Sequence, residues 1–210
     1  EICDKCKYVF LAIKPQVFDS VLPKLANHVK EDTVIVSIAA GITEEYIMKT
    51  TKDKVHTVIV MPNTPFLLGE GATALAKGTY TTDEEFEVVK SIFSTGGIAE
   101  VVPMDKMKEI IAINGSSPAF IYLYAKGFID YAKENGIDGD AALRLFAKSL
   151  IGSAKMMTES GKTIDELIKM VSSPGGTTLA GLDGLYQGKL TDVVKDCCER
   201  CTKRAYELSK

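Results

Sequence analysis

The sequence is poor in the residues and motifs of hydrolytic enzymes. It holds only two histidines in 210 residues, His28 and His56, and neither has a carboxylate partner at a motif spacing. No G-x-S-x-G, H-E-x-x-H or phosphate-binding P-loop sequence is present. These absences argue against hydrolysis by a catalytic triad or by a metal-bound water. They favour hydride transfer, in which a cofactor supplies the reactive atom and the protein positions it.

Long hydrophobic runs and an excess of positive charge are missing too. The run Tyr8–Ile13 is far too short to span a bilayer, and the charged start Glu1–Lys7 does not resemble a signal peptide. The net charge is −3 with mixed signs throughout, which leaves no basic surface for nucleic acid. We therefore expect a cytoplasmic globular protein with neither a membrane nor a nucleic acid as partner.

Five cysteines form a C-x-x-C near the start and a C-C-x-x-C near the end: Cys3, Cys6, Cys197, Cys198 and Cys201. Zinc ribbons place their two pairs about 15–20 residues apart, whereas nearly the whole chain separates these two. The second set also lies in a helical stretch, which does not form the knuckle that zinc favours. We expect free thiols in a reducing compartment and no metal site.

The first half alternates short apolar runs with amphipathic stretches. The expected strands cover residues 7–13, 33–38, 55–61, 72–76 and 99–102. The expected helices cover residues 15–29, 43–49 and 83–95. Strands of continuous apolar character joined by helices indicate a parallel sheet covered on both faces.

From Met104 onward no convincing strand occurs. The expected helices cover residues 105–113, 118–135, 139–160, 164–171, 177–187 and 191–209. The predicted fold class is therefore α/β followed by all-α, with domains at 1–104 and 105–210. The helix over 119–132 is apolar nearly all the way round, and a small helical domain offers little interior to bury it. We expect an intertwined homodimer formed chiefly by the helical half.

The G-x-G-x-x-G pattern of dinucleotide-binding domains does not occur before any expected helix. In addition, the first expected strand would leave one edge of its sheet open, and proteins usually cover such edges. We expect an N-terminal βαβ segment to precede this sequence. The alternative is a small α/β protein that binds no nucleotide.

Three loops follow expected parallel strands, where open α/β sheets bind ligands. They are Ala12-Ile13-Lys14-Pro15-Gln16, Ala39-Ala40-Gly41 and Met61-Pro62-Asn63-Thr64-Pro65. The small residues of the second loop allow a flat or phosphorylated ligand to approach the backbone. Lys14 offers a charge to a phosphate or is simply solvated at a helix start, and the sequence leaves both readings open.

The segment Ser172–Thr178 is a glycine-containing turn that opens an expected helix. Free backbone N–H groups and the positive end of the helix dipole make such a start an anion site, and the glycines Gly175 and Gly176 allow close approach. The alternative is an ordinary helix cap. A second small-residue turn, Asn114–Phe120, leads into the long apolar helix.

Taken together, these segments resemble the pyrroline-5-carboxylate reductase family. The resemblance extends over residues 8 to about 188, and its segments occur in the family's order. They are Phe10–Pro15, Ala39–Ile42, Met61–Pro65, Glu70–Thr73, Asn114–Phe120 and Ser172–Thr178.

The resemblance implies reduction of 1-pyrroline-5-carboxylate to L-proline with NADPH or NADH, the last step of proline biosynthesis. It implies a partial Rossmann-type domain followed by a helical domain that interleaves in a dimer, often within a larger ring. The residues implied for the cofactor are Ala12, Ile13, Lys14, Pro15, Ala39, Ala40, Met61, Pro62 and Asn63. Those implied for the substrate are Ser173, Gly175, Gly176, Thr177 and Thr178, with the Thr178 hydroxyl as the catalytic group near the ring nitrogen.

The sequence departs from this family in two places. Ser117 replaces a glycine of the usual Ser-Gly-Ser-Gly-Pro-Ala segment, and the G-x-G-x-x-[GA] element is not in this sequence. Two other functions stay open. One is a dehydrogenase of the β-hydroxyacid type, with Lys126 as its catalytic lysine, and the other is a non-catalytic dimeric binding protein of the same fold.

Overall fold

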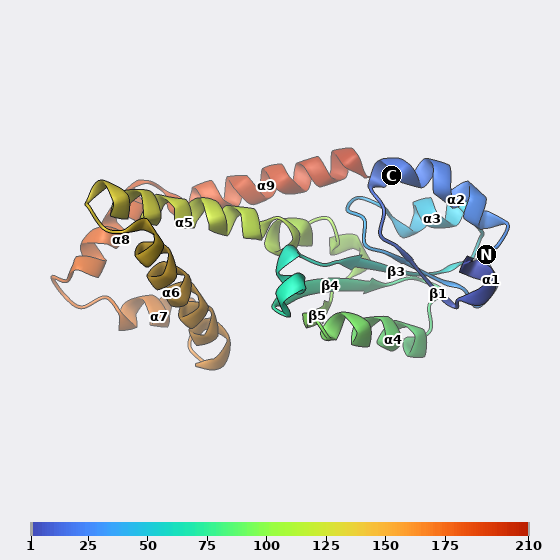
Figure 1. Ribbon diagram of the computed structural model, residues 1–210, viewed down its shortest axis with the longest axis horizontal. Helices are drawn as coiled ribbons and strands as arrows, with labels where there is room; N and C mark the ends of the chain where they lie inside the picture. The colour runs from blue at the N-terminus through green and yellow to red at the C-terminus, as the bar shows by residue number, and fades with distance from the viewer. Residues whose placement is uncertain (1, 210) are drawn as a thin grey trace. The chain divides into compact units, whose positions relative to one another are not determined.

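The structure is a computed structural model that describes residues 2–209. The chain divides into two compact units (Figure 1). Unit 1 comprises Glu1–Pro118 with Cys197–Lys210, and unit 2 comprises Ala119–Asp196.

Unit 1 contains a five-stranded sheet in the order β1-β2-β3-β4-β5. Its strands are β1 (Tyr8–Leu11), β2 (Val34–Ser37), β3 (His56–Met61), β4 (Gly71–Lys77) and β5 (Gly97–Val101). Strands β1, β2 and β3 are parallel, and every residue of β2 is buried. The apolar runs of β2 and β3 thus correspond to strands covered on both faces, as expected. The edge strand β1 is only partly covered, because its Phe10 is exposed.

The direction of β4 differs from the expected all-parallel sheet. β4 runs antiparallel to β3, and β5 runs parallel to β4, so the sheet is mixed. The reason is the length of the connection, because only residues 62–70 separate β3 from β4. A parallel return needs a crossover of about a dozen residues or more, so the chain turns back instead.

Helices cover both faces of this sheet (Figure 1). Helices α2 (Phe18–Ala26) and α3 (Glu44–Thr50) lie on one face and α4 (Asp83–Ser94) on the other. Unit 1 also contains α1 (Ile2–Lys5) and the 3₁₀ turns η1 (Pro15–Val17), η2 (Thr64–Leu68) and η3 (Met104–Lys106). The two layers enclose separate apolar cores, one around Phe18 and Leu22 and the other around Leu75 and Val89.

The helix expected at 105–113 is not formed as an α-helix. The 3₁₀ turn η3 is followed by a π-helix, η4 (Ile111–Gly115). The Ser116 amide donates to the Ile111 carbonyl at 2.8 Å, five residues back, which is the π pattern. The side chain of Asn114, a residue of this π-helical turn, is buried and donates to the Met61 carbonyl, which lies outside the turn. The sequence pattern of an ordinary α-helix does not reveal such a contact.

Unit 2 is helical, and no strand occurs among its described residues. Its helices are α6 (Gly139–Glu159), α7 (Ile164–Met170) and α8 (Thr177–Gln187), and the residues of α5 (Ser117–Glu134) and α9 (Leu190–Leu208) are divided between the two units. Gly136 and Gly161 follow α5 and α6 with positive φ, as the Asn-Gly and Ser-Gly pairs predicted. The α/β-then-helical fold class is therefore confirmed.

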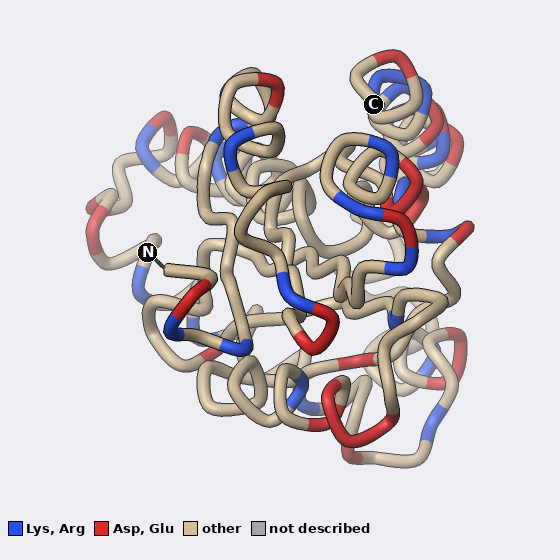
Figure 2. Tube along the Cα trace, turned by 90° about the vertical axis from the view of Figure 1, so that its right-hand side faces the viewer, with Lys and Arg blue, Asp and Glu red and all other residues tan. Residues whose placement is uncertain are grey.

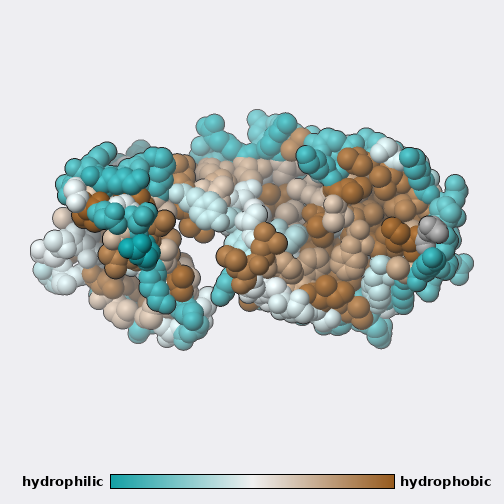
Figure 3. Space-filling model, viewed as in Figure 1, coloured by the Kyte–Doolittle hydropathy of each residue, from teal (hydrophilic) through white to brown (hydrophobic). Residues whose placement is uncertain are grey.

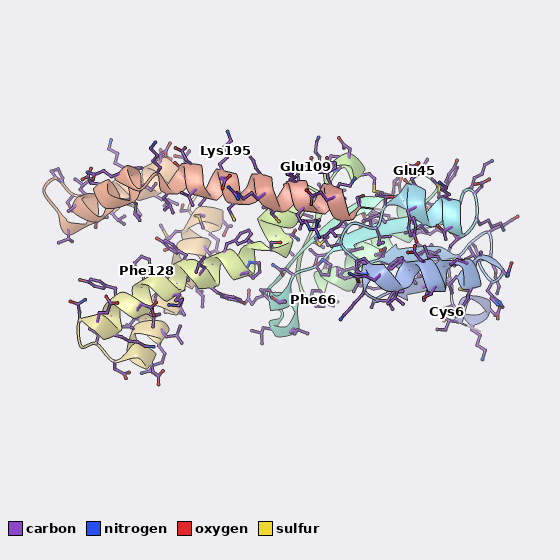
Figure 4. The ribbon with its side chains drawn as sticks, turned by 90° about the horizontal axis from the view of Figure 1, so that it is seen from above. Cys6, Glu45, Phe66, Glu109, Phe128 and Lys195 are labelled. Atoms are coloured by element: carbon purple, nitrogen blue, oxygen red, sulfur yellow. The ribbon has the colours of Figure 1, made fainter. Side chains whose placement is uncertain are left out.

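Many apolar side chains of unit 2 are exposed in the single chain (Figure 3). On α5, the exposed fractions of Tyr122, Leu123 and Tyr131 are 64%, 72% and 65%. On its other side this helix packs inside the unit, where the rings of Phe128 and Phe146 stack with centroids 4.3 Å apart (Phe128 is labelled in Figure 4). The apolar side chains expected all round this helix are thus only partly covered within one chain.

Charged residues of both signs are interspersed along the chain (Figure 2). Among the described residues, no helix is long and apolar enough to cross a membrane.

Candidate functional site

The carboxyl ends of the three parallel strands meet at one edge of the sheet. Leu11 pairs in register with Ser37, and Ser37 with Ile59, so the loops after β1, β2 and β3 emerge side by side. We call this region the carboxyl edge. It brings together all three loops that the sequence predicted for the cofactor.

The β1 loop offers both backbone and charge at the carboxyl edge. Ala12 is exposed, while Ile13 packs against the first apolar core and Pro15 begins η1. The Lys14 side chain is exposed, and no ion pair to a carboxylate is found for it among the described residues. Its ammonium is therefore available to a ligand.

The β2 loop is made of small residues. Ala39 is buried and Ala40 exposed, and Gly41 has a φ of 79° that side chains rarely adopt. A Cβ on Gly41 would lie 3.2 Å from the Leu208 carbonyl oxygen on α9. The glycine thus serves both the turn and the close packing of α9.

The β3 loop is held by two asparagines. The Asn63 side-chain oxygen accepts from the Ala72 amide at 2.9 Å, so the Asn63 side chain stabilises the connection between β3 and β4. The Asn114 Nδ2 donates to the carbonyls of Met61 and Ala72, at 2.7 and 3.0 Å. The loop therefore forms a fixed wall at the carboxyl edge.

A cavity of about 400 Å³ opens beside this edge in unit 1. Ala39 and Met61 line it together with residues of α3, the 104–111 segment and Tyr206 of α9. Ala40 lines a second cavity of about 250 Å³, with Ser116 and Cys201. Neither cavity is lined by residues of the β1 loop.

Charged groups gather at one side of the larger cavity. The Tyr206 hydroxyl donates to Glu109 at 2.8 Å, which raises the pKa of Tyr206 and lowers that of Glu109. The Lys108 ammonium lies 4.5 Å from the centre of the Tyr206 ring. Glu109 and Glu45 are both labelled in Figure 4. This cluster attaches α9 to the 104–111 segment.

The predicted substrate loop lies in unit 2 and is exposed. Gly175 has a φ of 71°, and the Gly176 amide donates to the Ser173 carbonyl at 3.0 Å. Gly176 is the N-cap of α8, and no side chain caps this helix. The first-turn amides at Thr177 and Thr178 therefore point to the open helix start, which suits an anion such as a carboxylate.

The second small-residue turn joins η4 to α5. The Ser117 hydroxyl, where the family usually has glycine, donates to the Asn114 carbonyl at 3.5 Å. The Cys201 thiol donates to the Ser116 hydroxyl at 3.4 Å. This turn thus helps to attach α9 to unit 1.

Two further predictions concern Lys126 and the cysteines. Lys126 is exposed on α5 and forms an ion pair with Asp130, one turn along the helix. All five cysteines are free, and no group of side chains able to hold a metal occurs within residues 2–209.

The sequence did not reveal the charged cluster around Glu85. This carboxylate is nearly buried and contacts His56 Nδ1 at 2.6 Å and the Lys7 ammonium at 3.0 Å. Burial raises the pKa of Glu85, but hydrogen bonds from the Thr82 amide, Lys7 and His56 outweigh this effect and hold it below its usual value. The Thr82–Glu85 capping box was visible in the sequence, but its partners lie far away in the chain.

Comparisons with known proteins agree with this geometry. Residues 104–208 match the family described as pyrroline-5-carboxylate reductase dimerisation, and residues 1–41 match the family described as NADP oxidoreductase coenzyme F420-dependent. The pyrroline-5-carboxylate reductase of Methanosarcina acetivorans is 35% identical over 96% of this chain and 75% of its own length. That of Escherichia coli K12 is 30% identical over 100% of this chain and 78% of its own.

Solved structures give the same result. A Plasmodium falciparum pyrroline carboxylate reductase, crystallised with NADP bound, superposes with a TM-score of 0.93 and 26% identity, covering 99% of this chain and 79% of its own. A pyrroline-5-carboxylate reductase from Coxiella burnetii gives a TM-score of 0.91 at 29% identity, with coverage of 99% and 78%.

The sheet, its carboxyl-edge loops and the helical second half define an α/β oxidoreductase of the NADP-dependent class. Within that class, the chain belongs to the pyrroline-5-carboxylate reductase family.

Proposed function

We propose that this chain reduces 1-pyrroline-5-carboxylate to L-proline, the last step of proline biosynthesis. The observation that carries the proposal is that relatives named for this activity align with 96–100% of the chain, through both of its units. The open helix start at α8 supports it further, because the substrate carries a carboxylate.

The carboxyl edge suits a dinucleotide cofactor, NADPH or NADH. Its β2 loop has only alanines and a glycine, which leave the backbone accessible, and the Lys14 ammonium is free to meet a phosphate. In the proposal, the β1 and β2 loops hold the adenosine-phosphate side, and Met61, Pro62 and Asn63 form the wall at the nicotinamide. When bound, the cofactor supplies the hydride.

The substrate loop holds the other reactant. The amides of Thr177 and Thr178 donate to the carboxylate, Gly175 and Gly176 leave room for it, and the Ser173 hydroxyl lies nearby. The Thr178 hydroxyl is the catalytic group and hydrogen-bonds to the ring nitrogen. Because that nitrogen is protonated in the reactive imine, the site needs orientation and an anion contact rather than a strong general acid.

We further propose the assembly and the location. Residues 1–104 form the cofactor domain, and residues 105–210 bind substrate and form an intertwined homodimer, which associates into a larger ring. The dimer would cover the apolar side chains that α5 exposes in the single chain. The free thiols fit the reducing cytoplasm.

The proposed function is tested by mixing the purified protein with pyrroline-5-carboxylate and NADPH or NADH and recording the loss of reduced-nicotinamide absorbance. We expect substrate-dependent oxidation, and the reverse reaction with proline and NAD(P)⁺ at high pH. A protein without either activity would contradict the proposal and favour a non-catalytic binding protein. Lys126→Ala distinguishes this function from that of a β-hydroxyacid dehydrogenase. Removal of the lysine should leave proline formation unchanged, whereas it would abolish the activity of such a dehydrogenase.

A further inference from the structure

Asn114 occupies an unusual place in unit 1. It lies in the π-helix η4, and its side chain and backbone are only 7% exposed. Single turns of π-helix are rare and occur frequently at functional sites. Asn114 is not among the residues proposed to contact the cofactor or the substrate.

The Asn114 amide group fixes backbone on two strands at once. Its Nδ2 donates to the Met61 carbonyl, where β3 ends, and to the Ala72 carbonyl, near the start of β4. The backbone amide of the same Ala72 donates to the Asn63 side-chain oxygen. The peptide groups around Ala72 are therefore held between two asparagines, one on the β3 loop and one on η4.

The cost of burying Asn114 argues for more than packing. Its side-chain oxygen is buried without a hydrogen-bond partner among the described residues, which is an unfavourable state for an amide. An apolar residue of similar size would fill the same space without that cost. What it would not provide is the pair of donors that fixes the loop after β3.

We propose that Asn114 is a positioning residue, which holds the Met61–Pro65 loop in the geometry that receives the nicotinamide end of the cofactor. This inference rests on the proposed function. Asn114 does not touch the reacting atoms itself. It acts through Met61 and Ala72, whose backbone it fixes.

The test compares Asn114→Leu and Asn114→Ala in the complete protein. Leucine fills the space and donates nothing, whereas alanine removes both the volume and the donors. We expect both variants to bind NADPH about tenfold more weakly in a fluorescence titration, since each lacks two buried hydrogen bonds. The KM for pyrroline-5-carboxylate should stay within about twofold, because Asn114 makes no bond to residues 173–178.

Hydrogen exchange without cofactor gives an independent measurement. The Ala72 amide should lose about tenfold of its protection in both variants, whereas amides of β2 should not change. The control is Asn135→Leu, which removes an exposed amide that donates to the Tyr131 carbonyl on α5. It should change neither the NADPH affinity nor the exchange at Ala72.

The outcomes are distinct. If Asn114→Leu retains both the NADPH affinity and the Ala72 protection while the unsubstituted protein is active, Asn114 only packs and the inference is wrong. If the unsubstituted protein neither binds NADPH nor converts the substrate, the proposed function fails and the inference fails with it.

Discussion

Thr178 combines two donors in one residue at the start of α8. Its amide is one of the first-turn N–H groups of the helix, and its side chain, which carries the hydroxyl, is exposed. Because the backbone supplies the anion contact, a side-chain change at Thr178 alters only the hydroxyl.

We predict that Thr178→Ala lowers kcat/KM about tenfold or more, the loss of a hydrogen bond of ~1.5 kcal/mol. Steady-state kinetics measure this directly. Thr178→Ser keeps the hydroxyl and should retain most of the activity. Thr158→Ala removes an exposed hydroxyl on α6 and serves as control. Unchanged kinetics in Thr178→Ala would remove this residue from the site.

Glu85 of α4 is expected to contribute to stability rather than catalysis, because its partner His56 begins β3 at the end opposite the carboxyl edge. We predict that Glu85→Gln lowers the free energy of unfolding by about 2 kcal/mol at neutral pH, because charged hydrogen bonds to His56 and Lys7 are lost. Thermal or urea unfolding measures this. Glu84→Gln makes the same charge change on an exposed neighbour and should cost little.

The pH dependence of this effect has a definite sign. The pKa of Glu85 is lower in the folded protein than its usual value, so its contribution is present above about pH 4.3, the ordinary pKa of glutamate. It disappears as the pH falls through the lowered folded-state pKa. The stability difference between Glu85→Gln and the unsubstituted protein should therefore shrink below about pH 4. A difference that persisted or grew in acid would contradict this assignment.

At the scale of elements, the connection between β3 and β4 packs closely against the start of β5, where two glycines leave room for it. Phe66 of η2 contacts the Phe93 ring with centroids 5.9 Å apart (Phe66 is labelled in Figure 4). A Cβ on Gly96 would lie 2.3 Å from the Phe66 ring. Gly97 has a φ of 144°, and a Cβ there would lie 2.0 Å from the Gly71 carbonyl oxygen.

We predict that Gly97→Ala destabilises the protein by about 3 kcal/mol or more, because backbone atoms of β4 cannot move aside and the φ is unfavourable. Its melting temperature should fall accordingly, or the protein should fail to fold. Gly152→Ala on α6, where nothing lies within 4 Å, should be neutral or slightly stabilising. Equal melting temperatures for the two variants would contradict the geometry.

The sequence predicted those features that depend on local pattern. Short runs rich in apolar residues located all five strands, and the turn Ser172–Gly176 located an exposed helix start. The parallel order of β1, β2 and β3 then placed three loops at one edge. These features need only the chain's own periodicity and its turn residues.

Features that depend on distant partners were missed. The reversal of β4 is an exception, because it follows from the length of one short loop that the sequence does show. The π-helix follows from the bonds of Asn114 to residues 42 and 53 positions away. The pair of His56 and Glu85 spans 29 positions, so no motif spacing reveals it. The roles of the individual site residues stay predictions.

At the scale of the whole molecule, the exposed apolar side chains of α5 are the predicted dimer interface. We predict that Leu123→Asp weakens the dimer strongly, because a charge would replace an apolar side chain at the predicted interface. Light scattering or sedimentation over a range of concentrations measures this. Glu134→Ala, an exposed change near the end of the same helix, should leave the dimer intact. A dimer unaffected by Leu123→Asp would place the interface elsewhere.

Unit 1 is assembled from two separate stretches of sequence, and this affects the order in which a growing chain can fold. The strands are synthesised first, but Ser116, Glu109 and Gly41 receive their partners on α9 only when residues 201–208 have been made. The ribosome must therefore produce the whole of unit 2 before unit 1 is complete. During translation the face that α9 covers stays open until residues 201–208 have been made.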